Sequence, residues 1–168
     1  GYGFFMIGPT GKIYQSAPLN RYSWHCGESK WPGLGSNVSR YLVGIEIANA
    51  GTLTKKGDKF VSWFGNEYLD QQVRYSKGTD EHPAGYYRKY TQEQEDALVK
   101  LLMWLKSNNP SVFNFDYVLA HSEVSGMKGL GRWRKSDPGG SLSISLDELR
   151  KRLNLLYRLK VEHESKET

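Results

Sequence analysis

The chain has 168 residues, of which 38% are hydrophobic and 24% charged, and this balance predicts one globular domain rather than a disordered chain. No apolar run approaches the roughly 20 residues that span a bilayer, and the first residues lack the basic region of a signal peptide. A single cysteine, Cys26, excludes an internal disulfide and a zinc site made of several cysteines. The net charge of +5 suits an anionic partner, without selecting between nucleic acid, a membrane surface and a cell-wall polymer.

The first half of the chain is predicted to be rich in strands. Residues 4–17, "FFMIGPTGKIYQSA", predict two short strands around a Pro-Thr-Gly turn. The Val- and Ile-rich run 41–50 predicts a buried central strand. Residues 51–90 keep no sustained hydrophobic period, so we expect a long surface insertion with a short hairpin.

Two helices are predicted from their capping signals. Thr91 and Gln94 form a capping box, and a leucine repeat at helical spacing follows from Leu98 to Leu105. Ser145, with a glutamate three residues later, opens a second helix whose leucines share one face.

The remaining segments complete the predicted fold. "FDYVLAH" (115–121) is expected to be a strand that ends at His121, and residues 161–168 are expected to form a fraying polar tail. The resulting order predicts an α/β fold, with a single mixed central sheet flanked by helices in one domain over residues 1–160. Functional sites of open α/β sheets lie outside the carboxyl ends of strands, where His121 would stand.

Three residues are candidates for a catalytic or metal-binding role, although two of them also have ordinary structural explanations. A lone histidine such as His121 is more often structural than a ligand, and Asp137 lies in an Asp-Pro-Gly-Gly sequence that is typical of turns. Glu46 stands between two isoleucines in an apolar strand, where an unpaired carboxylate is costly. It therefore either pairs with a cation or takes part in chemistry.

A divalent metal would explain these residues together. Zinc takes imidazole nitrogen and carboxylate oxygen, so His121 and Asp137 could bind it while Glu46 moves the proton of a bound water. Lys135 could point its ammonium toward a developing oxyanion, or it could simply belong to a solvated basic loop.

The segment 23–33, "SWHCGESKWPG", is a second dense cluster. Trp24 could stack on sugar or peptide with His25 as a polar edge, or the aromatic loop could pack on the core. A Cys26–His25 nucleophile pair is disfavoured, because neighbours in an extended chain point to opposite faces. The sequence gives little support for nucleic-acid binding, because it has no zinc-finger spacing, no RNA-binding motif and no basic helical stripe.

A family resemblance rests on six motifs in one order: GKIYQ, SWHCGES, VGIEIANAG, YTQEQEDALVKLLMWL, LAHSEV and GRWRKSDPGG. Over roughly residues 3–155 the chain resembles the zinc-dependent N-acetylmuramoyl-L-alanine amidases of the type-2 amidase superfamily, which includes phage lysozyme-amidases and peptidoglycan recognition proteins. The segment "KFVSWFGNEYLDQQVRY" also looks like an insertion of phage and bacterial members. The resemblance implies a peptidoglycan-amidase-like fold.

The resemblance also implies a reaction and residue roles. The reaction is hydrolysis of the amide between N-acetylmuramic acid and L-alanine in peptidoglycan, for cell-wall lysis or remodelling. The matched positions are His121 and Asp137 for the second and third zinc ligands, Glu46 for the catalytic glutamate, Lys135 for the residue that stabilises the tetrahedral intermediate, and Trp24 and His25 for the substrate groove.

One family position has no counterpart in this chain. The first zinc ligand of the family is a histidine upstream of the GKIYQ hairpin, and none of the four histidines stands there; Phe4 occupies a place where members often carry a histidine. Three explanations stay open: a truncated chain that lacks the N-terminal strand, another group that completes the site, or a peptidoglycan-binding module that does not catalyse.

The implied setting is the bacterial cell wall outside the cytoplasm. We expect Zn²⁺ as cofactor, peptidoglycan as partner, a monomer, and neither nucleic acid nor a membrane span. A bacteriolytic endolysin, encoded by a phage and released to the wall at lysis, would need no signal peptide.

Overall fold

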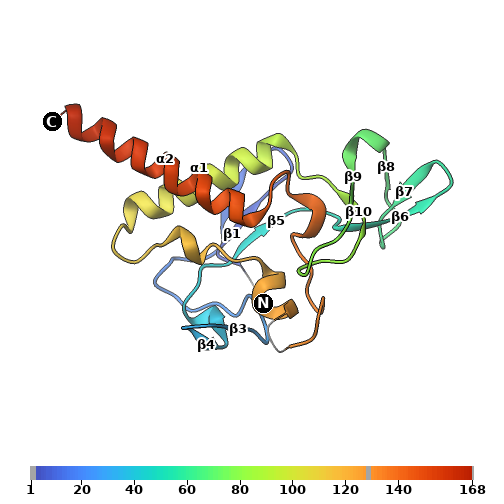
Figure 1. The fold of residues 1–168 in the computed structure, drawn as a ribbon, viewed down its shortest axis with the longest axis horizontal. Helices are drawn as coiled ribbons and strands as arrows, with labels where there is room; N and C mark the ends of the chain where they lie inside the picture. The colour runs from blue at the N-terminus through green and yellow to red at the C-terminus, as the bar shows by residue number, and fades with distance from the viewer. Residues whose placement is uncertain (1–2, 128–129, 168) are drawn as a thin grey trace.

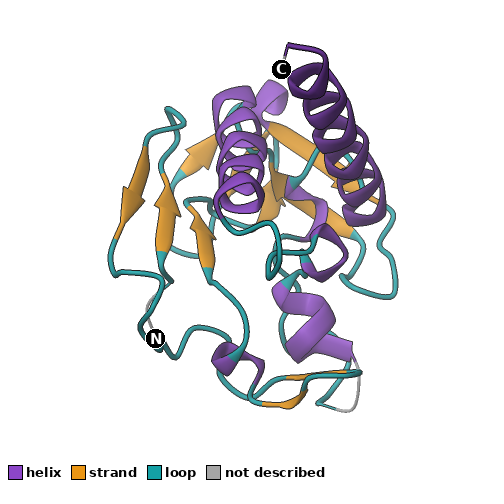
Figure 2. Ribbon diagram, turned by 90° about the vertical axis from the view of Figure 1, so that its left-hand side faces the viewer, coloured by secondary structure: helices purple, strands orange, loops and turns teal. Residues whose placement is uncertain are grey.

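The computed structural model describes residues 3–127 and 130–167 and has an α/β fold (Figure 1; Figure 2). The α/β class is confirmed. The single central sheet is wrong, because the strands of the described residues separate into three sheets. The separation arises because the strands between residues 52 and 88 pair with one another and bury an apolar cluster of their own.

The first sheet has the strand order β2-β1-β5, with β1 at Phe5–Ile7, β2 at Ile13–Gln15 and β5 at Ile45–Ile47. β1 and β2 are antiparallel, which confirms the two strands predicted around the turn. β5 runs parallel to β1, with Glu46 opposite Met6. The buried central strand predicted over 41–50 is wrong: within the described residues β5 is a short edge strand, since only β1 pairs with it.

Both helices begin at the predicted caps, and both views place them side by side (Figure 1; Figure 2). α1 spans Gln92–Asn108, and Thr91 and Gln94 exchange both capping-box hydrogen bonds. α2 spans Leu146–Glu167, where the Ser145 hydroxyl accepts the Glu148 N–H. Residues 161–167 are helical instead of frayed, and exposed ion pairs such as Lys160–Glu164 support the helix by no more than about 0.2–0.5 kcal/mol each.

The main core lies between the helices and the first sheet. It is a cluster of buried apolar side chains from β1 and the residue before it, both helices and the 3₁₀ turn at Phe115: Phe4, Phe5, Ile7, Ala97, Leu98, Leu101, Leu102, Leu105, Phe115, Leu149 and Leu153. Burial of each large apolar side chain contributes about 1.5–3 kcal/mol, so this cluster is what fixes α1 and α2 over the sheet. No helix among the described residues has the length and apolarity needed to cross a membrane.

The insertion is larger than the short hairpin predicted for residues 51–90. It forms a five-stranded sheet in the order β8-β7-β6-β10-β9, at the opposite end of the molecule from the C-terminal end of α2 (Figure 1). Its strands are β6 at Thr52–Lys56, β7 at Lys59–Val61, β8 at Glu67–Tyr68, β9 at Val73–Ser76 and β10 at Gly85–Arg88. Strands of two to five residues are too short to show a period, but Leu53, Phe60 and Val73 still form a buried cluster.

Short elements complete the chain. They are β3 at Lys30–Trp31, β4 at Gly35–Ser36, the 3₁₀ turns Val38–Arg40, Asp70–Gln72, Phe115–Tyr117 and Gly139–Ser141, and the π-helical turn Glu123–Met127. β3 and β4 pair as a two-stranded sheet.

The strand predicted over residues 115–121 is therefore wrong. Backbone groups of this segment bond to side chains instead of to a neighbouring strand. The Val118 carbonyl accepts from Arg150 Nε at 2.9 Å, and the Ala120 N–H donates to Glu123 Oε2 at 2.7 Å. His121 consequently begins a helical turn instead of ending a strand.

Candidate active site

His121 and Asp137 lie in contact, although 16 residues separate them in the chain. His121 Nδ1 is 3.0 Å from Asp137 Oδ2. The backbone supports the same approach, because the Ser122 N–H donates to the Asp137 carbonyl at 3.1 Å. The Asp137 side chain remains 64% exposed and that of His121 25% exposed, so a small ligand can reach both groups.

The second nitrogen of His121 also faces an acceptor oxygen. Nε2 lies 3.1 Å from the Cys26 carbonyl oxygen. A carbonyl and a carboxylate can both only accept, so Nε2 carries a proton, and Nδ1 donates to Asp137 in the protonated ring but offers it a lone pair in the neutral ring. Metal-binding histidines have this arrangement, in which a hydrogen bond from one nitrogen orients the other.

The contact between the two side chains moves both pKa values. Burial lowers the pKa of His121, but the hydrogen bond to Asp137 and its negative charge outweigh burial, and the net pKa lies above its ordinary value. Burial raises the pKa of Asp137, but His121 outweighs it and the net pKa is lowered. Each group therefore favours the charged form of the other when no metal separates them.

Glu46 shares a cavity of about 500 Å³ with this pair. Ile45 and Ile47 pack against the main core, so the residue between them points to the other side of the sheet, where it is exposed. Much of the cavity lining is apolar, from α1 and the segment that follows it. Glu46, His121 and Asp137 therefore all line the same cavity.

Of the other predicted site residues, only His25 lines the cavity among the described residues. His25 lines the cavity, and its Nε2 lies 2.8 Å from the Leu42 carbonyl. Among the described residues, Trp24 and Lys135 stay outside the lining. Trp24 is half-exposed beside Tyr22, while Lys135 is exposed and its charge lowers the pKa values of both His121 and Asp137.

Cys26 and His25 contact each other, contrary to the expectation that neighbours point apart. Cys26 Sγ is 3.0 Å from His25 Nδ1, and the chain bends at Cys26 instead of being extended there. Gly44 admits the imidazole, since a Cβ there would lie 2.5 Å from His25 Cγ. Burial raises the pKa of Cys26, so the thiol is a weak nucleophile and the contact is structural.

Tyr90 is a cavity residue that sequence reasoning missed. It lines the cavity, and burial, together with the charges of Asp137, Glu95 and Glu46, raises its pKa. The phenol therefore stays protonated and can act as a hydrogen-bond donor. Its only signal in the sequence was a position directly before the capping box of α1.

The donor atoms fit part of a zinc site. Imidazole nitrogen and carboxylate oxygen are ligands that zinc takes, and a catalytic site uses three protein ligands plus a water. Across residues 3–127 and 130–167, no group of three or more His, Cys, Asp or Glu side chains could hold a metal ion. His121 and Asp137 thus offer two donor atoms of the kinds that zinc takes, and the described residues bring no third beside them.

The family model described as N-acetylmuramoyl-L-alanine amidase matches residues 2–140. The chain belongs to this amidase family. Membership supports peptidoglycan amidase activity in general and action on the cell wall, in a family that is generally zinc-dependent. No curated protein shows a significant match to the chain. The matched range contains every candidate site residue and ends before α2.

Within this amidase family domain, the insertion anchors the turn that carries Asp137. Arg74 Nη1, from β9, donates to the carbonyls of Gly140 at 3.2 Å, Ser141 at 3.4 Å and Leu142. The ring of Tyr87, from β10, packs on the turn so closely that a Cβ on Gly140 would lie 2.6 Å from Tyr87 Cδ2. The insertion is therefore part of what positions the site.

Proposed function

We propose that the protein hydrolyses the amide between N-acetylmuramic acid and L-alanine in peptidoglycan, with zinc as cofactor. The single observation that carries the proposal is the 3.0 Å contact between His121 Nδ1 and Asp137 Oδ2, in a cavity that Glu46 also lines. Family membership supports the substrate class.

His121 and Asp137 would hold the metal, and the Cys26 carbonyl would keep the imidazole turned so that Nδ1 is free to bind it. When bound, zinc polarises a substrate carbonyl and lowers the pKa of a bound water. The open faces of both side chains leave room for substrate and water.

Glu46 would act as the general base and then the general acid. Its carboxylate accepts a proton from the attacking water and returns it to the leaving amine, a role that requires access to the cavity rather than burial. Tyr90, protonated, can donate to the developing oxyanion, and Lys135 adds positive charge from the edge of the loop.

The substrate would run past His25 toward Trp24. His25 lines the cavity, and the exposed pair of Tyr22 and Trp24 offers aromatic faces on which sugar or peptide can stack. We place the activity at the bacterial cell wall, as a monomeric lytic or remodelling enzyme of the endolysin kind.

The test is amine release from purified peptidoglycan with and without added zinc, with identification of the new N-terminal residue. The proposal expects zinc-dependent exposure of L-alanine, with release by the Glu46→Gln variant reduced about 10²–10⁴-fold. Wall binding without release, by a folded protein saturated with zinc, would instead favour a peptidoglycan-binding module. Release of any other residue would reject the assigned bond.

A further inference from the structure

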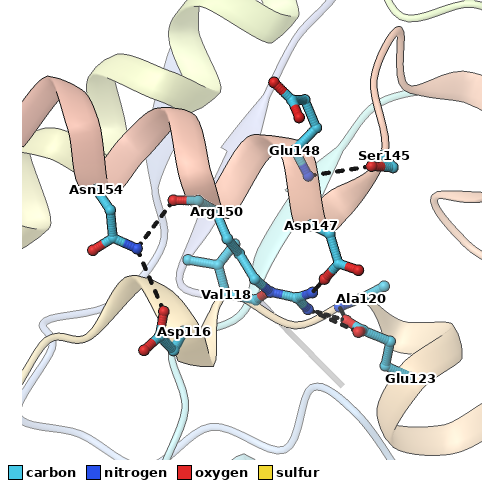
Figure 3. Close-up of polar contacts among 9 residues, drawn as sticks. All are labelled: Asp116, Val118, Ala120, Glu123, Ser145, Asp147, Glu148, Arg150 and Asn154. Carbon is cyan, nitrogen blue, oxygen red and sulfur yellow. Dashed lines mark hydrogen bonds and ion pairs between the residues drawn. The ribbon is translucent and has the colours of Figure 1, made fainter.

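A buried ion pair joins Arg150 to Glu123, two residues after His121 in the chain (Figure 3). Arg150 Nη2, from α2, is 2.7 Å from Glu123 Oε1 and 2.6 Å from Glu123 Oε2. The two side chains are only 14% and 11% exposed, in contrast to the largely open Asp137. A charge pair this far from solvent is costly unless its remaining polar atoms also find partners.

Those partners are the backbone atoms just before His121, as Figure 3 shows. Arg150 Nε donates to the Val118 carbonyl at 2.9 Å, and Glu123 Oε2 accepts the Ala120 N–H at 2.7 Å. Arg150 Nη1 donates to Asp147 Oδ1 at 2.7 Å, which orients the guanidinium from its own helix. The ion pair thus binds the chain on both sides of Leu119.

The direction of the His121 side chain depends on this stretch of backbone. Residues 118–120 belong to neither a strand nor a helix, so no ladder of backbone hydrogen bonds fixes them. The Ala120 carbonyl accepts from the Glu123 N–H at 3.1 Å, while the Ala120 N–H goes to the Glu123 carboxylate. One residue, Glu123, therefore closes the turn at both ends, and Arg150 holds that residue.

We infer that Arg150 is a positioning residue: through Glu123 it fixes the backbone from Val118 to His121 so that the imidazole faces Asp137 with Nδ1 and Cys26 with Nε2. Arg150 does not line the cavity and contacts no candidate ligand in the described residues. It also lies beyond residue 140, where the family match ends. The consequence for turnover rests on the proposed function, but the consequence for the imidazole does not.

Removal of Arg150 alone would leave a buried, unpaired carboxylate and could unfold the protein for that reason. The informative variant replaces both partners, Arg150→Met with Glu123→Met, because well-packed apolar residues can substitute for a buried pair with little loss of stability. The matched control is Arg158→Met on the same helix, where the arginine forms an exposed pair with Glu162 at 3.9 Å.

Two measurements on the folded proteins test the inference. Imidazole ¹H–¹⁵N spectra of the metal-free protein report the tautomer and hydrogen bonding of His121, and chelator competition reports zinc affinity. In the double variant we expect the parent spectrum of His121, with both ring nitrogens hydrogen-bonded, to be lost and zinc affinity to fall about 10- to 100-fold, with kcat reduced and KM little changed. Arg158→Met should behave like the parent protein.

The result that would overturn the inference is a folded double variant with the parent imidazole spectrum and parent zinc affinity. If the double variant does not fold, the same spectrum is measured on Arg150→Lys. Lysine keeps the charge but lacks the planar guanidinium that donates to Glu123 and to Val118 at the same time. A parent spectrum in Arg150→Lys would also overturn it. If the parent protein releases no amine, the proposed function fails while the spectrum still answers the question about Arg150.

Discussion

The two candidate metal ligands reach the cavity from segments that are anchored in different ways. The segment that carries His121 is held from α2 by a buried ion pair, with charges that have left water. The turn that carries Asp137 is held from the insertion by Arg74 on three carbonyls and by Tyr87 against two glycines. One anchor is electrostatic and the other depends largely on close packing.

The difference determines how each half of the site should respond to change. A buried ion pair tolerates replacement of both partners together but not of one, because the remaining charge would be buried without a partner or solvent. A close-packed contact is sensitive instead to added side-chain volume, so a single methyl group is enough to disturb it. Variants can therefore separate the chemistry of the cavity from each of its two supports.

The largest effect is expected from a variant that touches neither support. Glu46→Gln keeps the shape of the one exposed side chain of β5 and removes only its basicity, so hydrolysis of peptidoglycan should fall by about 10²–10⁴-fold. Zinc content and melting temperature should stay at parent values, as measured by metal analysis and calorimetry. Parent-like turnover would remove Glu46 from the mechanism.

A methyl group at the Asp137 turn should have the next largest effect. In Gly140→Ala the new Cβ would lie 2.6 Å from the Tyr87 ring and 3.0 Å from Ser76 Cβ. Such overpacking costs about 1–3 kcal/mol of unfolding free energy, measured by urea titration, and should weaken zinc binding by displacing Asp137. Gly8→Ala is the control, since its Cβ would find 3.7 Å of room. Equal stability of the two variants would contradict the packing anchor.

The polar part of the same anchor should have a smaller effect. Arg74→Lys keeps the charge but loses the planar guanidinium, whose Nη1 donates to the carbonyls of Gly140, Ser141 and Leu142. We expect a loss of about 0.5–1.5 kcal/mol in unfolding free energy and faster hydrogen exchange in the Asp137 turn. Unchanged exchange would show that Tyr87 alone suffices.

The smallest effect is a pH dependence that distinguishes the two histidines. His82, in the insertion, is buried between Ser76 and Thr79 and packs edge-on to Tyr87, and burial lowers its pKa. Because the unfolded chain then binds more protons, its stability contribution is present above the unfolded pKa near 6.5 and is lost as pH falls through the folded pKa. The slope cannot exceed about 1.4 kcal/mol per pH unit.

Denaturant titrations between pH 5 and 8 measure this effect in the parent protein and in His82→Gln. In the variant, the unfolding free energy should depend less steeply on pH at the acid end of this range. His121 supplies the opposite sign in the metal-free protein: its pKa is raised, so its contribution is present at low pH and is lost as pH rises through the folded pKa. His121→Gln should therefore cost most stability at acid pH. Identical pH profiles for the two variants would contradict the contrast.

Local sequence signals predicted the elements that depend on neighbouring residues. The hairpin of β1 and β2 and the capping box of α1 need only short-range hydrogen bonds, and both are present. In the segment 115–121, where a strand was predicted, backbone groups bond instead to the side chains of nearby Glu123 and of Arg150, which lies far along the chain. No local period carries that information.

The sequence by itself determined the chemistry available to this protein: an imidazole, two carboxylates and a basic loop in an order that indicates an amidase. Only the tertiary structure decided which groups meet. It placed His121 against Asp137, turned Cys26 and His25 toward each other and added Tyr90 to the cavity. The physical reason is that side-chain direction depends on backbone held by distant partners, here α2 on one side and the insertion on the other.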